Sequence, residues 1–302
     1  SRRSSENPKG TPLYKGHPFG WITFPNYIPM EFLENIALKP HTVFKIGGPA
    51  RYFCEATSAD DVKTAVEFAR EKNKPYLILG AGSNILISDR GFDGVAVKMA
   101  LTHLAIHETH VEADAGLAMA RVVAETVRTG LTGFEWGIGI PGTIGGSVRG
   151  NAGCFGAEMK DVVHVVRIFD ADALSLRTLT RQDCKFGYRD SVFKHHPSWI
   201  VLGVVLELAA GDSARSQKLI QEYSIARRKT QDIGAQCAGC MFKNVLWGDV
   251  DKSALTKKFP ELKQFSSSPT IPAAFLIEQA GLKGMAMGKA QISDKHAKYV
   301  VN

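Results

Sequence analysis

The sequence predicts a mixed fold of helices and strands, either α/β or α+β, and three observations point to it. Short β-branched runs of strand length, such as 76–79 and 199–208, alternate with amphipathic helical patterns. Glycine-dense loops separate these runs, and no period of repeat-protein length recurs. No stretch reaches the roughly 18 apolar residues that a membrane span needs. We therefore expect a chain that is neither all-helical nor embedded in a membrane.

The first predicted unit combines one helix with several short strands. Ser58 can cap that helix, and Asp60 and Asp61 complement the positive end of its dipole. An N-terminal extension is expected over residues 1–37, so this unit would begin at residue 38. Strands are expected around the helix at 52–55, 76–79, 85–87 and 95–98.

The second unit is predicted to surround one helix at 117–129, which Gly130 ends, with strands. Its strand-like segments are 103–113, 162–169 and 199–208. A third stretch opens with a helix from 214 to about 229 and closes with a helix at 273–279 and strand material up to Asn302.

Composition and charge narrow the classes of function. The 302 residues carry 37 Lys and Arg against 30 Asp and Glu, a formal net charge of +7, and 44% are hydrophobic. This positive surplus suits small phosphate-bearing substrates better than nucleic acid, because no continuous basic stripe interleaved with aromatic residues is present. Five scattered cysteines favour free thiols in a reducing compartment. We therefore expect a cytoplasmic protein without a nucleic-acid or membrane partner.

Two glycine-rich loops are candidates for holding phosphates. The first, Gly-Ala-Gly-Ser-Asn at 80–84, lacks the third glycine of a dinucleotide fingerprint and is predicted to run from strand to strand. Its amides, with Ser83 and Asn84, would form a nest for an anion, and an ordinary tight turn is an equally good interpretation. The second, at 137–146, has five glycines in ten residues, which cost backbone entropy unless something approaches the backbone or packing demands them. Without a Walker lysine or a Rossmann helix, the pair favours a flavin dinucleotide.

Two further segments carry reactive side chains. In the segment 187–191, Arg189 offers the forked donor that suits a carboxylate or an enolate-like anion, although adjacent Tyr and Arg residues are most often a surface pair. Cys237 and Cys240 lack the companions of a zinc site, so no metal is predicted. Cys237 is interpreted as a buried thiol. Cys240, with an ordinary pKa of about 8.5, would be protonated at neutral pH and able to act as a general acid.

Seven motifs in order along the chain resemble the UDP-N-acetylenolpyruvoylglucosamine reductase family. They lie at 41–50, 79–86, 139–146, 151–153, 187–191, 238–244 and 276–284. The resemblance implies an α+β fold with a two-part FAD-binding region of the vanillyl-alcohol-oxidase (PCMH) type, followed by an α/β substrate-binding domain. The implied bounds are 38–100 and 101–212 for the two FAD-binding parts and 213–302 for the substrate-binding domain.

The resemblance also implies the chemistry. Noncovalent FAD would be reduced by NADPH and would pass hydride to the enolpyruvyl group of a UDP-sugar, giving UDP-N-acetylmuramate for peptidoglycan synthesis. Arg189 matches the family's enolate-stabilising cation, and Cys240 stands where the family's proton donor is usually a serine. The implied FAD contacts are Gly80, Ala81, Gly82, Ser83, Asn84, Ile140, Pro141, Gly142, Thr143, Gly145 and Gly146. The expected substrate contacts are Tyr188, Lys243, Asn244 and, from charge alone, Arg227.

Two departures from the family pattern leave other functions open. Val245 replaces a usual proline, and family members continue beyond the position of Asn302 with a segment that carries a catalytic glutamate. The substrate-binding domain is therefore expected to be cut short, or the catalyst to be impaired. The alternatives are a generic flavin oxidase of the same superfamily and a flavin-binding relative without turnover. A monomer is expected.

Overall fold

The computed structural model of the chain describes residues 30–232 and 234–302. Most of the N-terminal extension predicted for 1–37 therefore lies outside the described residues. The described part contains strand β1 (Leu33–Ala37), which pairs antiparallel with β2 (Pro49–Ala56). The first sheet thus begins before the boundary expected at residue 38. β1 is an edge strand, and its sequence lacks the alternation of apolar and polar residues that identifies a half-buried strand.

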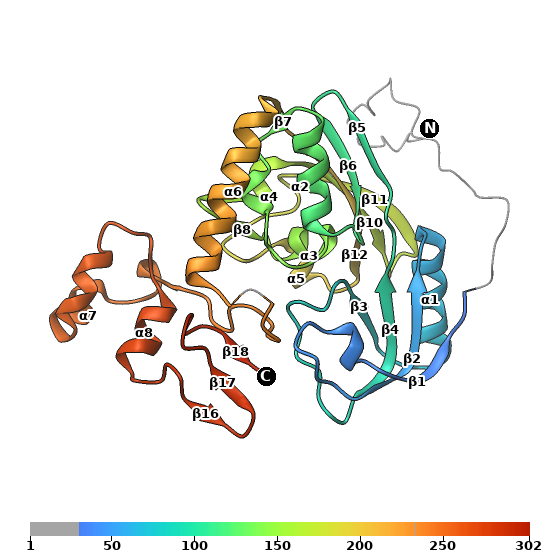
Figure 1. Cartoon of the computed structure of the whole chain (residues 1–302). Coiled ribbons are helices and arrows are strands. Elements are labelled where there is room, and N and C mark those ends of the chain that lie inside the picture. Colours follow the sequence, from blue (N-terminus) through green and yellow to red (C-terminus); the bar gives the residue numbers. More distant parts are fainter. Residues whose placement is uncertain (1–29, 233) are drawn as a thin grey trace, which may run out of the picture.

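In the described chain the first sheet has the strand order β1-β2-β4-β3, and helix α1 packs against it (Figure 1). β2 and β3 both run parallel to β4. The remaining bounds are Ala59–Glu71 for α1, Tyr76–Leu79 for β3 and Phe92–Met99 for β4. The helix after Ser58 and the strands expected at 52–55, 76–79 and 95–98 are thereby confirmed.

Ser58 begins α1 through two reciprocal hydrogen bonds. The backbone N–H of Asp61 donates to the Ser58 hydroxyl over 3.1 Å, and the backbone N–H of Ser58 donates to the Asp61 carboxylate over 3.0 Å. This capping box satisfies amides that a helix otherwise leaves unpaired at its start.

The strand expected at 85–87 is not formed, and that prediction is wrong. The chain after residue 84 is irregular until β4 begins. Ile87 is buried with Leu38 and Phe53 in a small apolar cluster. The run is therefore apolar because it packs, and apolar content alone does not distinguish packing from strand pairing. The loop 80–84 consequently leads from β3 into an irregular segment.

The second sheet is antiparallel and has the order β11-β10-β12-β6-β5 among the described strands. The strand-like segments predicted at 103–113, 162–169 and 199–208 form the β5–β6 hairpin, β10 and β12. The bounds are β5 Leu104–His107, β6 His110–Asp114, β10 Val163–Asp170, β11 Ser175–Thr180 and β12 Trp199–Glu207. The predicted helix is α2 (Met119–Arg128), and Gly130 follows it with a φ of +78°.

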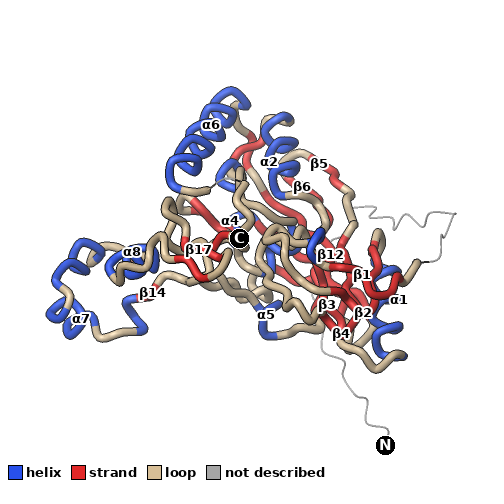
Figure 2. Tube along the Cα trace, turned by 60° about the horizontal axis from the view of Figure 1, so that its bottom comes forward, coloured by secondary structure: helices blue, strands red, loops and turns tan. Residues whose placement is uncertain are grey.

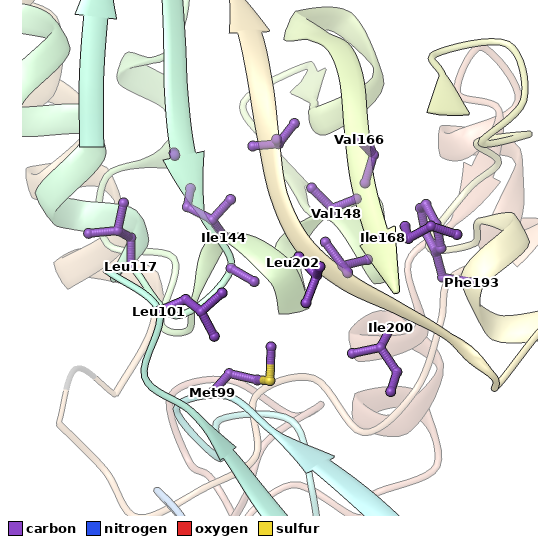
Figure 3. Packing of buried hydrophobic residues seen from close by; sticks show 14 of the residues in the cluster. Met99, Leu101, Leu117, Ile144, Val148, Val166, Ile168, Phe193, Ile200 and Leu202 are labelled. Atoms are coloured by element: carbon purple, nitrogen blue, oxygen red, sulfur yellow. The ribbon is translucent and has the colours of Figure 1, made fainter. Parts of the chain in front are cut away.

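One hydrophobic core joins the two sheets. Met99 and Leu101, where the chain leaves β4, belong to the same cluster as Ile144 and Leu202 (Figure 3). Burying each such side chain contributes roughly 1.5–3 kcal/mol. The sheets are therefore fixed relative to each other by shared packing, which holds the loops between them in place.

Short elements surround these loops and connect the second sheet to helix α6. α6 (Ser213–Thr230) confirms the helix expected from 214 to about 229 and packs beside α2. The others are η1 Lys39–His41, β7 Leu131–Thr132, η2 Glu135–Gly137, α3 Ile144–Arg149, β8 Gly153–Cys154, β9 Ala157–Glu158, α4 Met159–Val162, α5 Val192–His195 and β13 Ala209–Ala210.

The C-terminal lobe lies beyond α6 and is built from short elements (Figure 1). They are β14 Val245–Leu246, η3 Trp247–Asp249, α7 Lys252–Lys258, η4 Pro260–Phe265, β15 Thr270–Ile271, α8 Ala273–Gln279, β16 Ala286–Met287, β17 Ala290–Ile292 and β18 Val300–Val301. α8 matches the predicted helix, whereas α7 was not predicted. The chain's last residue, Asn302, lies between this lobe and the first sheet, where its side chain donates to the Phe44 carbonyl over 3.1 Å (Figure 2).

No helix in the described part of the chain combines the length and the apolar character that crossing a membrane requires.

Candidate active site

The two glycine-rich loops meet, although they are far apart in the sequence. The Ser83 hydroxyl donates to the Pro141 carbonyl over 3.0 Å. A β-carbon added at Gly80 would lie 2.6 Å from the Thr143 Oγ1, and one at Gly142 would lie 3.0 Å from the Ser83 Oγ. The two segments predicted to bind FAD are therefore in direct contact.

The second loop opens a helix, which the sequence analysis did not expect. Thr143 caps α3, and its hydroxyl accepts from the Gly146 N–H over 3.5 Å. Gly145 lies so close to Ala115 that an added β-carbon would sit 2.8 Å from the Ala115 Cβ. Helix propensities do not predict this helix, because it contains two adjacent glycines and each glycine disfavours a helix interior by about 1 kcal/mol.

The loop 80–84 has the chemistry to hold a dinucleotide phosphate. Its carbonyls are used within the protein, since Gly82 accepts from the Val43 N–H over 3.0 Å and Gly80 accepts from the Lys98 ammonium. None of the described residues accepts a hydrogen bond from the amides of residues 81–84. Unpaired amides in a glycine turn are a recognised anion cradle. The backbone of this loop, with the Ser83 and Asn84 side chains, therefore fits the pyrophosphate of FAD.

Arg189 is held in a tight turn by backbone carbonyls. Its φ is +54°, and Gly187 and Asp190 exchange backbone hydrogen bonds of 3.0 and 3.1 Å across the turn. The guanidinium donates to the Gly153 carbonyl over 2.6 Å and to the Asn151 carbonyl over 3.3 Å. Its remaining N–H groups are available to an anion.

The motif at 151–153 positions this turn. The fully buried Asn151 side chain donates to the Gly187 carbonyl over 2.8 Å and to the Glu158 carboxylate, and it accepts from the Lys160 N–H over 3.0 Å. The buried Asn151 thus fixes the turn that carries Arg189. Asn151 had no predicted role, although its motif is one of the seven that carry the family resemblance.

Cys240 lies where the loop after α6 pairs with the end of the chain. Cys240 forms an isolated β-bridge with Tyr299, and the Met241 N–H donates to the Lys298 carbonyl over 2.9 Å. Burial of the Cys240 thiol by the surrounding protein raises its pKa, and the positive charges of Lys298 and Arg189 oppose that rise. The side chain still has a solvent-exposed side. The thiol is therefore protonated at neutral pH, accessible, and within electrostatic range of Arg189.

Tyr188 connects the Arg189 turn to the Cys240 loop. Its hydroxyl accepts from the Asn244 backbone N–H over 3.3 Å. The Asn244 side chain is already engaged by the protein, because its oxygen accepts from the Ala273 N–H over 3.2 Å and from the Lys298 ammonium over 3.0 Å. Lys243 is exposed. The pKa of Lys194 is lowered, first by burial of Lys194 and next by the positive charge of Lys243.

Arg227 is buried and lies beside the second glycine loop. It is 7% exposed, and its Nη1 donates to the Cys154 Sγ over 3.3 Å. A β-carbon at Gly139 would lie 2.9 Å from its Nε, which has no hydrogen-bond partner in the described chain. Arg228 and Lys229, by contrast, are exposed. The contiguous basic run is thus divided between two environments, and the substrate contact of Arg227 stays a prediction.

One open surface cleft borders the loop that leads from α6 to Cys240. It has a volume of about 540 Å³ and is lined by Asp232, Gln236 and Asn302 among others, none of which was predicted as a site residue. The grouping of reactive side chains, rather than the cleft, identifies the site.

Two family models match separate parts of the chain. Residues 50–178 match the family described as FAD binding domain, and residues 231–302 match the C-terminal domain of UDP-N-acetylenolpyruvoylglucosamine reductase. The reductase of that name from Anoxybacillus flavithermus is 35% identical over 271 residues, which cover 89% of this chain and 82% of that protein. The one from Caldanaerobacter subterraneus is 35% identical over 269 residues, covering 89% and 81%.

A solved structure agrees with the sequence comparison. The crystal structure of UDP-N-acetylenolpyruvylglucosamine reductase (MurB) from Thermus caldophilus aligns with a TM-score of 0.72 and 30% identity, covering 90% of this chain and 88% of that one. The fold of an FAD-binding region of the PCMH type followed by a smaller C-terminal lobe is thereby confirmed. On this evidence, the chain belongs to the UDP-N-acetylenolpyruvoylglucosamine reductase family.

Proposed function

We propose that this chain is an FAD-dependent reductase that uses NADPH to convert UDP-N-acetyl-3-O-(1-carboxyvinyl)-glucosamine to UDP-N-acetylmuramate, a precursor of peptidoglycan. The observation that carries the proposal is the grouping of Arg189 and Cys240, a fixed cation and a protonated thiol, at one site. The names of the 35% identical relatives support the same reaction.

The loops 80–84 and 139–146 would hold FAD, which when bound would supply the redox chemistry that links NADPH to the terminal carbon of the enolpyruvyl double bond. Arg189 would stabilise the negative charge that then develops on the enolate-like carboxylate. Because the guanidinium is already oriented by the Gly153 and Asn151 carbonyls, little reorganisation is needed during the reaction. A single preorganised donor of this kind lowers a barrier by about 3 kcal/mol.

Cys240 would complete the reduction by protonating the carbon next to the carboxylate. Its S–H bond breaks as the C–H bond forms, and the resulting thiolate recovers a proton from solvent. A general acid must be protonated beforehand, and the raised pKa of Cys240 satisfies that requirement at neutral pH. Burial raises this pKa and the charges of Lys298 and Arg189 oppose that rise, with a net upward direction that keeps the thiol protonated.

Binding of the UDP-sugar would involve the predicted substrate contacts in different ways. Tyr188 and Lys243 lie on the two segments that meet at the site, and Lys243 presents an exposed ammonium that suits a phosphate. The Asn244 backbone pairs with Tyr188 while its side chain organises the loop. We assign Arg227 to the boundary between the flavin loop and the substrate region, because it packs against Gly139.

The predicted domain division, with substrate binding assigned to 213–302, is part of this proposal. A monomeric state and a cytoplasmic location are also part of this proposal. The five free thiols support the cytoplasmic location, because free cysteines persist in reducing compartments.

The proposal is tested by an anaerobic visible spectrum of the purified chain. We expect a flavin absorption band that NADPH bleaches and that the enolpyruvyl UDP-sugar restores. An oxidase would instead be reoxidised by oxygen during turnover of an alcohol and not by the enolpyruvyl substrate. A yellow protein that NADPH never bleaches would favour a flavin-binding relative without turnover and contradict the proposal.

A further inference from the structure

We propose that Lys298 is a positioning residue for Cys240: it holds the proton-donating loop against the turn that precedes β18 and keeps a positive charge near the thiol. This inference rests on the proposed function, in which Cys240 is the acid. Lys298 was not among the residues that the sequence analysis selected.

Two contacts attach the Cys240 loop to the segment that carries Lys298. The Lys298 carbonyl accepts from the Met241 N–H over 2.9 Å, and the neighbouring Tyr299 forms a β-bridge with Cys240. Backbone pairing on both residues fixes the distance between the two segments. Lys298 itself stands opposite Met241, so its side chain leaves the paired backbone one residue away from the bridge between Cys240 and Tyr299.

The ammonium of Lys298 makes the third attachment, at the far end of the same loop. It donates to the Asn244 side-chain oxygen over 3.0 Å, and that oxygen also accepts from the Ala273 N–H at the start of α8. The Asn244 N–H in turn donates to the Tyr188 hydroxyl over 3.3 Å. Lys298 therefore connects the turn before β18, the Cys240 loop and the Arg189 turn.

The charge of Lys298 acts on the thiol directly. The groups that bear on Cys240 are Lys298 from the turn before β18, Arg189 from its own turn, Cys237 from the same loop and Tyr299 across the bridge. Burial raises the pKa of Cys240 and also raises that of Tyr299, to about 12, so Tyr299 stays neutral. Lys298 and Arg189 are the two cations in this set, and Lys298 is the larger influence.

The consequence for the reaction concerns the state after proton transfer. When Cys240 gives up its proton, a thiolate is left in a partly buried site, where an uncompensated charge is costly. The ammonium of Lys298 compensates that charge. Arg189 at the same moment is paired with the substrate's developing anion, so the two cations serve different negative groups.

The test removes the charge and measures the thiol without any turnover. The variants are Lys298→Met, Lys298→Gln, which retains a donor for Asn244, and Lys298→Arg, which retains the charge. Lys295→Met, at an exposed lysine nearby, is the matched control. Iodoacetamide labelling of Cys240 is followed against pH by tandem mass spectrometry, which assigns the label to Cys240 rather than Cys237.

We expect the midpoint of labelling to rise by about one pH unit in the Met and Gln variants and to stay at the wild-type value in the Arg variant and the control. In parallel, NADPH should bleach the flavin of every variant at the wild-type rate, whereas substrate should restore the band about tenfold more slowly in the Met and Gln variants.

An unchanged labelling midpoint in Lys298→Gln would overturn the inference, even if Lys298→Met fails to fold. Failure of the proposed function has a different signature. In that case substrate would not reoxidise the wild-type flavin, while the labelling midpoints would still shift as expected.

Discussion

Gly80 shows how a single missing β-carbon permits the two cofactor loops to touch. The Thr143 hydroxyl, which also caps α3, occupies the place where a side chain would begin. Any larger residue must displace Thr143 or separate the loops. Close approach therefore explains this glycine without any appeal to backbone strain.

A Gly80→Ala variant is expected to weaken FAD binding about tenfold, or about 1.4 kcal/mol, because the added carbon pushes Thr143 out of its position. A dissociation constant from fluorescence titration with FAD measures the effect. Gly248→Ala is the control, since an added β-carbon there meets nothing within 4 Å. Equal affinities in the two variants would show that the loop contact does not shape the flavin site.

Some of the proposed site residues could be predicted from the sequence and others could not, and individual residues show why. Arg189 and Cys240 are identified because their roles come with a resemblance to a known family. Lys298 has no such signal, since its partner Asn244 lies 54 residues away and spacing does not reveal that contact. Arg227 was predicted from its charge alone. Charge does not indicate that its side chain is buried whereas those of Arg228 and Lys229 are exposed.

At the scale of elements, helix α6 is fastened to the flavin region by Glu135. The carboxylate accepts from the Ser216 hydroxyl in α6, from the Thr132 hydroxyl over 2.6 Å and from the Gly133 N–H over 2.8 Å. Burial alone would raise the pKa of Glu135, but these hydrogen bonds together lower it below its ordinary value of 4.5. The start of α6 is thereby joined to η2, immediately before the second glycine loop.

Glu135→Gln is expected to reduce the free energy of unfolding at pH 7 by about 1–3 kcal/mol, because an amide nitrogen would face groups that donate. The folded-state pKa of Glu135 is lowered, so its stabilisation is present above pH 4.5 and is lost as the pH falls through the lower folded value. The difference between wild type and variant should therefore shrink in acid. Urea unfolding at pH 7 and near pH 4 measures it.

Glu125→Gln provides the control for that series. Glu125 pairs with Arg128 at the surface of α2, where such ion pairs contribute about 0–1 kcal/mol. If both variants lose equal stability at pH 7, Glu135 does not anchor α6.

Elements were predicted correctly where local signals decide them. α1 has its capping serine, β3 is a compact apolar run, and α8 follows a proline. α3 and α7 were missed for physical reasons. α3 contains two glycines, of which Gly145 packs against Ala115. α7 has only seven residues, with no buried position to produce a period. The irregular segment with Ile87 was predicted as a strand because its apolar residues, which pack in a small cluster, resemble those of a buried strand.

At the scale of the whole molecule, the two groups proposed to be catalytic come from two parts of the chain that are joined by polar contacts. Arg189 belongs to the body with the shared hydrophobic core, and Cys240 belongs to the lobe beyond α6 (Figure 1). The Tyr188 to Asn244 hydrogen bond joins them. Both loops predicted to hold the flavin are formed within the body, so on the proposed function, of the two catalytic groups, only the proton donor is supplied by the lobe.

This division predicts that Cys240 affects only one half-reaction. In Cys240→Ala, NADPH should reduce the flavin at the wild-type rate, because both predicted flavin loops are intact. Reoxidation by the enolpyruvyl UDP-sugar should slow by about 100-fold or more, since a positioned general acid contributes that much. Cys240→Ser should retain substantial activity, as a hydroxyl can still deliver a proton.

Rapid mixing of the three prereduced proteins with substrate is the most direct measurement of this account. It predicts a flavin band that returns quickly in wild type, more slowly with Ser at position 240 and at a residual rate in Cys240→Ala, after equal bleaching by NADPH in all three. Return of the band at the wild-type rate in Cys240→Ala would show that another group supplies the proton, and would contradict the assignment of Cys240 as the acid.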